Sequence, residues 1–415
     1  MINFTKKNID HSPIRDSVFS VAAKAAEAIK IYGKDNVVNA TIGSLYNEEG
    51  ELVALKTVFD TYNNIPAVEK AKYAQSFNGN DNFRKAVYNW VCGDKVKLRH
   101  DVIATPGGSG AVSLAIADIL DEGETLVLPD IAWGSYKLMA SMNNENCRFY
   151  SMFDGDKFNL ESFVSTCRQV MEKQGKVLAI INDPCHNPTG YSLTEEEWKE
   201  LIAAINRLSK KGPFVLLDDI AYIDYSYNLD TCRNYMRNFN DIGEDVMIIV
   251  AFSSSKTLTS YGLRCGAAVV LAKREEAVNE FISLSEKSAR ALWSNIPNAA
   301  MENFVLVTGE KHEEFMAEKQ EYVELLKERS RAFVSEALAC GLDCYPYKEG
   351  FFVTVKVEDK DILAKYHEEL MKNNIFAVVV NKGIRVAVCS LPVKQCKGLA
   401  PKMKEILDRV SRTVI

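Results

Sequence analysis

Residues 251–266, AFSSSKTLTSYGLRCG, contain a single lysine, Lys256, among small hydroxyl residues. The apolar run that leads into this stretch, VMIIVAF (246–252), has the length and the β-branched content of a buried strand. A charged side chain at the end of a core strand is costly unless it is paired or takes part in chemistry. The stretch therefore predicts a buried sheet with a functional lysine at the end of one strand.

Similar short apolar runs recur earlier in the chain, and helix-like segments such as NFRKAVYNWV (82–91) and AVSLAIADIL (111–120) separate them. The runs are TLVLP (125–129), VLAIIND (177–183) and FVLLDD (214–219). Strands of this kind, bounded by turns and alternating with helices, are typical of a parallel sheet that is buried on both faces. We therefore predict an α/β fold whose large domain has a mostly parallel sheet covered by helices.

The pattern changes after Pro297. Residues 299–338 are charged and helix-periodic, which predicts one long connecting helix. Strands are predicted in GFFVTVKV (350–357) and GIRVAVCS (383–390), and helices at residues 17–32 and 394–412. We therefore expect a large domain at residues 45–298 and a smaller α+β domain built from residues 1–44 and 299–415.

The composition excludes several classes of function. The chain has 415 residues, 47% of them hydrophobic, and a net charge of −6, which opposes binding to nucleic acid or acidic membranes. It has no apolar run of membrane-spanning length, and its first residues lack the apolar core of a signal peptide. The ten cysteines form no CxxC pair and the five histidines do not cluster with them, so neither a metal site nor a disulfide framework is expected. We expect a cytoplasmic protein.

One candidate anion site lies in TPGGSGAVSLAIADIL (105–120). Small residues followed directly by a helix expose backbone N–H groups at the positive end of the helix dipole. Gly108 and Gly110, with Asp130 twenty residues further on, also allow a dinucleotide-binding fingerprint, but Ser113 occupies the position of its third glycine. A plain tight turn is the remaining alternative.

Two further predicted strand ends carry polar groups. NDPCHNPTG (182–190) is a rigid loop that could direct the Asn187 amide toward a ligand, or simply connect a strand to a helix. In FVLLDDIAYIDY, Asp218 and Asp219 close a strand and Tyr222 follows, with one aspartate a candidate helix cap and the other a candidate functional group. Ligands of open parallel sheets bind beyond the carboxyl ends of the strands, where these residues are expected.

The serines at 253–255 and Arg264 flank Lys256. Hydroxyl groups and a guanidinium together bind phosphate well, and arginine does so with two parallel hydrogen bonds. A buried lysine with a lowered pKa is a nucleophile that forms Schiff bases. An ordinary surface lysine after a strand is the alternative if this stretch is considered alone.

Together, HNPTG (186–190), D-x-A-Y (219–222), S-x-x-K (253–256) and Arg264 resemble the fold-type I pyridoxal-phosphate enzymes. Within them the chain is most similar to the class I aminotransferases, close to the aspartate and aromatic aminotransferases, over about residues 36–390. The order and spacing of the four motifs make the resemblance specific.

The resemblance implies pyridoxal 5'-phosphate (PLP) as the cofactor. Lys256 would hold it as a Schiff base, the internal aldimine, and would later carry a proton. Asp219 would pair with the pyridinium nitrogen and keep the ring an electron sink. The other implied cofactor contacts are Tyr222 and Asn187 at the ring oxygen, Gly108, Ser109, Ser253 and Arg264 at the phosphate, Trp133 stacked on the ring, and Tyr73 at the phosphate in the other subunit of a homodimer.

The resemblance also implies how an amino acid substrate is held. Arg385 matches the arginine that binds the substrate's α-carboxylate, Gly43 matches a loop glycine near the same group, and Asn187 and Phe352 would line the site. In SARALWSNIP (288–297), Arg290 matches an arginine of aspartate aminotransferases that reaches across the dimer to the substrate's side-chain carboxylate.

Several positions depart from the family pattern. Trp293 replaces a tyrosine, Ile296 replaces the first residue of a Pro-Pro pair, and Tyr136 stands where many relatives have histidine. Tyr73 lies one residue farther from Gly79 than is usual.

The predicted activity is transfer of an amino group between an L-amino acid, aspartate or glutamate or else an aromatic one, and a 2-oxo acid by a ping-pong mechanism. A β-lyase, decarboxylase or cyclising synthase of the same fold would use the same Lys256 and Asp219. A non-catalytic PLP-binding regulator is a weaker alternative, because the roughly 35 residues before the matching region are too few for a DNA-binding domain.

Overall fold

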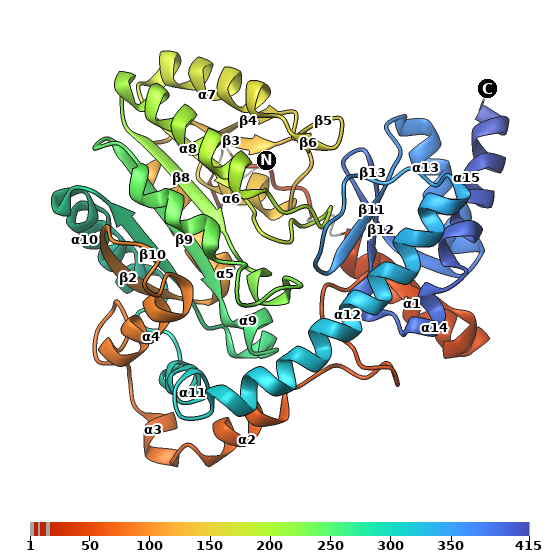
Figure 1. The fold of residues 1–415 in the computed structure, drawn as a ribbon, viewed down its shortest axis with the longest axis horizontal. Helices are drawn as coiled ribbons and strands as arrows, with labels where there is room; N and C mark the ends of the chain where they lie inside the picture. The colour runs from red at the N-terminus through yellow and green to blue at the C-terminus, as the bar shows by residue number, and fades with distance from the viewer. Residues whose placement is uncertain (1–3, 7–8, 14–16, 415) are drawn as a thin grey trace.

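The computed structural model of the protein has two β-sheets, and the long helix α12 (His312–Cys340) runs from the helices beside the larger sheet to those beside the smaller one (Figure 1). It describes residues 4–6, 9–13 and 17–414. The remaining residues, 1–3, 7–8, 14–16 and 415, belong to the predicted small domain and lie outside the described residues.

The larger sheet has seven strands. Their order across the sheet is β2 (Arg99–Thr105), β10 (Gly266–Ala272), β9 (Val246–Ser253), β8 (Phe214–Asp219), β7 (Val177–Ile181), β3 (Thr125–Pro129) and β4 (Asn146–Tyr150). Strand β10 runs antiparallel to both of its neighbours, and the other neighbouring pairs are parallel. The α/β fold with a mostly parallel sheet is therefore confirmed.

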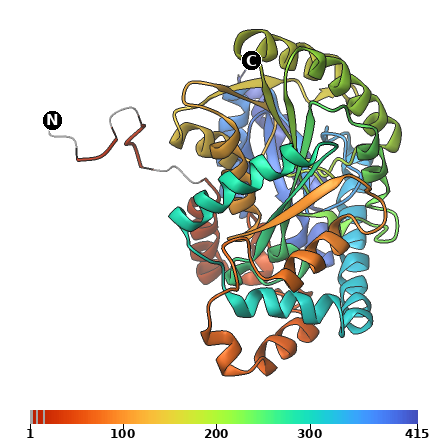
Figure 2. The same cartoon turned by 90° about the vertical axis from the view of Figure 1, so that its left-hand side faces the viewer.

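Alternation of side chains along the strands explains why helices cover both faces. Leu126 and Leu128 of β3 belong to the core on one face, and Val127 between them belongs to the core on the other. The first face is covered by α5 (Gly107–Ile119), α6 (Ser135–Met142) and α10 (Glu275–Leu292). Helix α10 also packs against β2, and both lie toward the viewer in Figure 2. The second is covered by α4 (Asp81–Val91), α7 (Leu160–Gln174) and α8 (Glu195–Leu208).

The smaller sheet joins residues from both ends of the chain. Its strand order is β1 (Val38–Ala40), β12 (Ile375–Val380), β13 (Gly383–Ala387) and β11 (Phe352–Lys356). Strand β1 is parallel to β12, and the other pairs are antiparallel. The helices beside it are α1 (Ser17–Tyr32), α13 (Lys360–Lys372) and α15 (Leu399–Val414), and α1 occupies the residues predicted for it.

Two predicted helices are each divided in the structure. The helix expected at 299–338 consists of α11 (Asn298–Thr308) and α12, because the backbone at Gly309 (φ −103°, ψ −93°) leaves the helical conformation. The helix expected at 394–412 consists of the short α14 (Val393–Cys396) and α15. Gly398 between them has a φ of 75°, which glycine adopts without steric cost.

The remaining elements are short. They are α2 (Lys56–Asn64), α3 (Ala67–Ala71), α9 (Ser254–Thr257), the two-stranded pair β5 (Phe153–Asp154) and β6 (Lys157–Phe158), and the 3-10 helices η1 (Lys34–Asn36), η2 (Ser209–Lys211), η3 (Ile223–Tyr225), η4 (Asn234–Asp241), η5 (Tyr261–Leu263) and η6 (Val388–Ser390). Within the described part of the chain, no helix has both the length and the apolar character needed to cross a membrane.

Candidate active site

Lys256 lies on the single helical turn α9, which begins where β9, an inner strand of the larger sheet, ends. The side chain of Ser253, the last residue of β9, accepts the N–H of Ser255 at 3.3 Å and caps this turn. Nζ of Lys256 lies 4.7 Å from the centre of the Tyr261 ring and 5.7 Å from that of Tyr222. The lysine is therefore surrounded by aromatic rings at the carboxyl edge of the sheet.

The surroundings of Lys256 favour its neutral amine. Burial lowers the pKa of Lys256 to about 8, and the positive charges of Arg264 and Arg385 act in the same direction. Asp219 opposes this effect with its negative charge. A primary amine with such a pKa is partly unprotonated near neutral pH and can attack a carbonyl carbon.

The N-terminus of α5 lies directly against Ser253 and Arg264. A Cβ atom at Gly107 would lie 2.5 Å from Nη2 of Arg264, and one at Gly108 would lie 2.9 Å from Cβ of Ser253. Only a backbone without side chains fits this approach, and Ser109 follows in the same first turn of the helix. The helix start, a hydroxyl and a guanidinium thus meet at one point, which is a suitable site for a phosphate group.

Arg264 is held at this point by an unusual backbone and several hydrogen bonds. Its φ of 50° lies in the left-handed region, which residues other than glycine seldom adopt. Its Nη1 donates to the Tyr261 carbonyl at 2.8 Å and to Oγ of Ser255 at 3.1 Å, and its Nη2 donates to the Pro106 carbonyl at 3.3 Å. Such strained conformations persist where surrounding contacts fix them, often at functional sites.

Asp219, at the end of β8, is buried and receives three kinds of support. The Tyr136 hydroxyl donates to its Oδ2 at 2.6 Å, and the Ala221 N–H donates to its Oδ1 at 3.1 Å. The Asn182 amide donates to its carbonyl at 2.5 Å. Burial raises the pKa of Asp219 to about 6, although these hydrogen bonds to the carboxylate and the charge of Lys256 lower it. Trp133 lies edge to face against Tyr136, with ring centres 5.3 Å apart.

Asp218 points to the opposite face of the sheet from Asp219, as alternation along a strand requires. Its Oδ2 accepts a hydrogen bond of 2.7 Å from the Tyr235 hydroxyl in the core on that face. The expectation that one of the two aspartates caps a helix is therefore wrong, because Asp218 binds a buried tyrosine.

Arg385, on β13 of the smaller sheet, contacts Asn187, which follows a strand of the larger sheet. Its Nη1 donates to Oδ1 of Asn187 at 3.2 Å, and its Nη2 donates to the Thr41 carbonyl at 2.8 Å. Its guanidinium carbon lies 4.3 Å from the centre of the Phe352 ring. A buried arginine between an amide and an aromatic ring can bind a carboxylate with two parallel hydrogen bonds.

Gly43 lies on the same side of the site. A Cβ atom there would lie 2.7 Å from Cζ of Phe352 and 3.8 Å from the Tyr222 hydroxyl. The rings of Tyr222 and Phe352 are themselves in edge-to-face contact, with centres 5.5 Å apart. Residues predicted from three distant parts of the chain therefore converge here.

The comparison with known protein families establishes the family of this chain. The sequence profile of the family "Aminotransferase class I and II" matches residues 35–402. The chain belongs to this family. Aminotransferases of classes I and II are PLP-dependent enzymes, so PLP is the cofactor of this aminotransferase.

Three similar proteins illustrate the relationship. An aspartate aminotransferase of Salmonella typhi is 26% identical over 66% of this chain and 68% of its own length. An aromatic-amino-acid aminotransferase of Pseudomonas aeruginosa is 29% identical over 59% of this chain and 60% of its own length, which is less than two thirds. The crystal structure of an aminotransferase from Anaerococcus prevotii covers 98% of both chains with 31% identity and a TM-score of 0.93.

The residues of this aminotransferase fit PLP. The approach of Gly107 and Gly108 to Arg264 and Ser253 leaves backbone N–H groups and a guanidinium for the phosphate. Asp219 provides a buried carboxylate for a protonated ring nitrogen. Lys256 provides an amine whose lowered pKa suits capture of an aldehyde.

Two predicted site residues lie elsewhere. Nη1 of Arg290, near the end of α10, donates to Oγ of Ser294 at 2.6 Å, and its guanidinium carbon lies 4.9 Å from the centre of the Phe77 ring. Tyr73 is 85% exposed. Among the described residues, neither has a hydrogen bond, ion pair or ring contact with Lys256 or Asp219, so within one chain they are not brought to the site.

Sequence reasoning missed two residues that organise this site. Tyr261 lies 4.7 Å from Lys256, and its hydroxyl accepts the Leu45 N–H at 3.0 Å. Asn182 links two strand ends, because its Oδ1 accepts the Asn187 N–H at 2.7 Å while its amide holds the Asp219 carbonyl. The available signal was position, since Asn182 is the first polar residue after an apolar strand.

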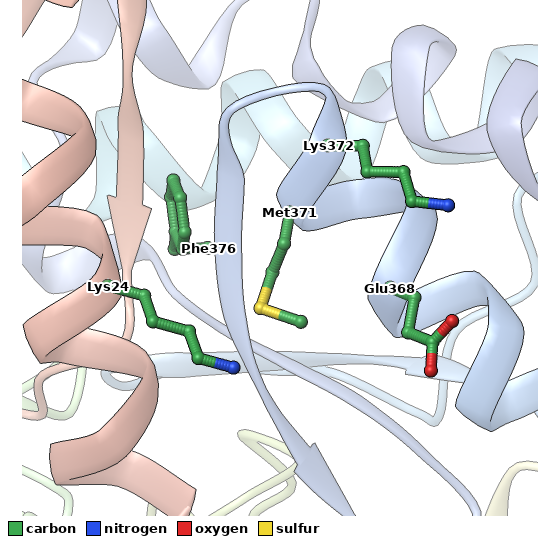
Figure 3. Close-up of a pocket in the computed structure, with 5 residues that line it drawn as sticks. All are labelled: Lys24, Glu368, Met371, Lys372 and Phe376. Atoms are coloured by element: carbon green, nitrogen blue, oxygen red, sulfur yellow. The ribbon is translucent and has the colours of Figure 1, made fainter. Parts of the chain in front are cut away.

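A surface hollow of about 360 Å³ lies apart from this site, between α1 and α13 beside the smaller sheet (Figure 3). Its lining residues are Lys24, Glu368, Met371, Lys372 and Phe376, none of which was predicted to be functional. The described residues contain no group of three or more His, Cys, Asp or Glu side chains arranged to hold a metal ion. The candidate active site is identified by the convergence of predicted residues around Lys256, not by a cavity.

Proposed function

We propose that this aminotransferase moves the amino group of an L-amino acid, aspartate or glutamate foremost, to a 2-oxo acid. The observation that carries the proposal is the buried guanidinium of Arg385, bonded to Asn187 beside Phe352 and suited to an α-carboxylate. Both the amino donor and the 2-oxo acid have such a carboxylate, so one site serves two half-reactions in turn. The first product leaves before the second substrate binds, which is a ping-pong mechanism.

Each side chain around the cofactor is assigned a separate role in the reaction. PLP, when bound, supplies an electron sink that makes the proton on the substrate Cα acidic. We assign the transfer of that proton to Lys256, whose pKa of about 8 leaves part of the amine neutral near pH 7. We assign to Asp219 the pairing with the ring nitrogen, to Tyr222 and Asn187 the ring oxygen, and to Trp133 stacking on the ring.

The side-chain specificity is proposed to come from a second copy of the chain. Arg290 is exposed, and the exposed Tyr73 precedes by four residues the Phe77 ring against which Arg290 packs. In a homodimer, Arg290 would bind the substrate's side-chain carboxylate in the other subunit's site, and Tyr73 would contact the phosphate there. A guanidinium selects a carboxylate by charge and by paired hydrogen bonds.

An aromatic amino donor is the second candidate. The relative from Pseudomonas aeruginosa is an aromatic-amino-acid aminotransferase, and two rings, Trp133 and Phe352, lie among the residues assigned to the site. An aromatic substrate would pack between apolar rings and leave the Arg290 guanidinium uncompensated by charge.

The reaction type is tested with the PLP-loaded enzyme, aspartate and 2-oxoglutarate. Formation of glutamate is the expected result. Formation of alanine without glutamate would identify a β-decarboxylase, and release of pyruvate and ammonia from cysteine, whose Cβ carries a leaving group, would identify a β-lyase. Either result in the absence of glutamate formation would overturn the proposal. The same experiment with Lys256→Ala is expected to give no glutamate, because the proton transfer is assigned to the amine of Lys256.

The specificity is tested with half-reaction rates for aspartate, glutamate, tyrosine, phenylalanine and alanine. Arg290→Met is expected to lower kcat/KM for aspartate by about 100-fold and to leave alanine within about twofold, because only aspartate loses a charge-assisted pair. Arg274→Met, at the other end of α10, is the matched control for loss of an exposed arginine. An equal loss for alanine would contradict the assignment of Arg290.

The cysteines support a cytoplasmic location. All ten are unpaired. Unpaired thiols are typical of a reducing compartment, so we propose that the enzyme works in the cytoplasm, which fractionation of its native cells would test.

A further inference from the structure

A buried lysine that the proposed chemistry does not use lies in the N-terminal third of α12. Lys319 has no exposed surface, and its Nζ donates a 2.6 Å hydrogen bond to the carbonyl of Thr257. The same Nζ lies 4.2 Å from the centre of the Tyr225 ring. Burial of an ammonium is costly, and an apolar side chain would fill this space at less cost. The charge therefore calls for a role beyond packing.

The buried carboxylate of Asp224 binds the side chain of Thr257, whose carbonyl Lys319 binds. Oδ2 of Asp224 accepts the Thr257 hydroxyl at 2.6 Å and the Trp90 indole N–H at 3.1 Å. Oδ1 of Asp224 is ion-paired with Arg233. Burial opposes the ionisation of Asp224, but the charges of Arg233 and Lys319 and its hydrogen bonds hold its pKa below the usual value. Asp224 therefore accepts the Thr257 hydroxyl as a carboxylate.

Thr257 directly follows Lys256 in the turn α9, which has only four residues. So short a helix has little stability of its own. Within the turn, the Leu258 N–H donates to the Ser254 carbonyl at 2.8 Å, and the Thr257 hydroxyl, besides its bond of 2.6 Å to Asp224, lies 3.2 Å from the Ser253 carbonyl. The hydroxyl of Thr257 is held by one buried charge and its carbonyl by another of opposite sign. The peptide unit that follows Lys256 is thus fixed from two directions.

We propose that Asp224 and Lys319 are positioning residues which, through Thr257, fix the turn that carries Lys256 and so set the rate at which its amine reacts with a carbonyl group. This inference rests on the proposed role of Lys256. Neither positioning residue needs to touch the substrate or the cofactor. Because Lys319 belongs to α12, the link also ties the position of Lys256 to the helix that runs toward the smaller sheet (Figure 1).

A merely structural role predicts a different outcome from a positioning role. If the charges only hold α12 against the larger sheet, their loss lowers the melting temperature and leaves the reactivity of Lys256 in the folded protein unchanged. If they position Lys256, reactivity falls even in a variant that stays folded. Thr257 separates the two, because valine has the shape of threonine without its hydroxyl, and serine retains the hydroxyl.

The test measures capture of PLP by the cofactor-free protein in the absence of any amino acid. Capture is followed by visible absorption and by borohydride trapping, with the labelled Lys256 peptide quantified by mass spectrometry. Thr257→Val is expected to slow capture about tenfold, and Thr257→Ser to stay within about twofold of the unaltered protein. Lys319→Met is expected to slow capture at least as much, because the Thr257 carbonyl loses its buried donor. Thr166→Val, at a buried threonine of α7, is the matched control and is expected to leave the capture rate unchanged.

Three results would each contradict the proposal. Capture by Thr257→Val at the unaltered rate, or equal slowing in Thr257→Ser and Thr257→Val, would overturn the role of Asp224, which acts through the hydroxyl. Capture by a folded Lys319→Met at the unaltered rate would overturn the role of Lys319, which acts through the carbonyl. Melting temperatures of the same samples show that each measurement reports a folded protein, and Thr257→Val keeps the test decisive if Lys319→Met does not fold. A protein that captures PLP normally but transfers no amino group would contradict the proposed function and not this inference.

Discussion

The hydroxyl of Tyr136, on α6, donates a 2.6 Å hydrogen bond to Oδ2 of Asp219, 83 residues away at the end of β8. Both side chains are buried, and Asp219 is the residue proposed to pair with the ring nitrogen of PLP. A carboxylate in this environment tends to take up a proton, which would cancel its attraction for a positively charged ring. The tyrosine therefore supports the charge on which the electron sink depends.

Tyr136→Phe is expected to weaken PLP binding by about tenfold, because Asp219 loses a donor that stabilises its charged form. Burial already raises the pKa of Asp219 to about 6, and the hydrogen bond from Tyr136 lowers it, so the substitution raises it further. The acid limb of PLP binding is then expected to move toward neutral pH by about one pH unit. Absorption titrations with PLP from pH 5 to 8 measure both effects.

Tyr136→His is the control, because the histidine ring can donate a hydrogen bond to the same carboxylate. It is expected to bind PLP within about threefold of the unaltered protein. If Tyr136→Phe leaves both the affinity and the acid limb unchanged, the hydrogen bond does not support the charge of Asp219.

The rate at which the cofactor-free protein captures PLP is expected to depend on pH through Lys256. Only the neutral amine attacks a carbonyl, and burial lowers the pKa of Lys256 from 10.5 to about 8. The rate should therefore rise about tenfold per pH unit below pH 8 and level off above it. A rate that keeps rising to pH 10 would show an ordinary lysine.

The charge of Arg385 provides the control for this profile. Its positive charge lowers the pKa of Lys256, so Arg385→Met is expected to move the bend of the profile to higher pH. An unchanged bend would contradict this electrostatic contribution.

Arg264→Gln is expected to weaken binding of PLP by about 10- to 100-fold, because the phosphate loses a charged donor. Pyridoxal, which lacks the phosphate, provides the internal control and is expected to lose much less affinity than PLP, because only the effect of Arg264 on the pKa of Lys256 remains. Fluorescence titrations with the two compounds give the comparison. Equal losses for PLP and pyridoxal would show that Arg264 supports the fold of the site and not the phosphate.

The part of the candidate site that depends on short motifs could be predicted from the sequence. Lys256, Asp219 and Asn187 each follow an apolar strand, and parallel strands bring their carboxyl ends to one edge of the sheet. The motifs therefore predicted where along the chain the strands end and which side chains lie near one another at those ends. Helix α1 was also predictable, because its apolar residues recur with helical period.

The parts that could not be predicted depend on contacts between distant segments. Lys319 lies 62 residues from Thr257 in the sequence. The helical period of the segment around Lys319 predicts that one face of the helix is buried, but it does not predict which group the lysine contacts there. Asp130, which a dinucleotide fingerprint would require for ribose, is instead ion-paired with Lys382, in the turn between two strands of the smaller sheet. The break in the predicted helix at Gly309 depends on how the segments on its two sides pack, and one glycine in a periodic segment is a weak signal.

The pairing of Asp130 with Lys382 leads to a last prediction, which concerns how the two sheets hold a substrate. Asp130 follows β3 of the larger sheet, and Lys382 lies in the turn between β12 and β13, three residues before Arg385. The Asn381 amide donates to the Asp130 carbonyl at 2.5 Å in the same contact. If the chain divides into the two domains expected at 45–298 and in the remainder, this contact crosses between them.

Lys382→Met is expected to raise KM for the amino donor by about two- to fivefold, because partly exposed ion pairs contribute about 0.5–1 kcal/mol. The contact holds the strand of Arg385, which is proposed to bind the substrate, whereas Ser253, Arg264 and the start of α5, which are proposed to bind the phosphate, lie beside the larger sheet. PLP affinity and kcat should therefore stay within about twofold. Lys394→Met, which removes an ion pair with Asp35 beside the smaller sheet alone, should change none of these values. A loss of PLP affinity in Lys382→Met equal to the rise in KM would mean that the contact stabilises the whole site, and that substrate and cofactor binding are not separated between the two sheets.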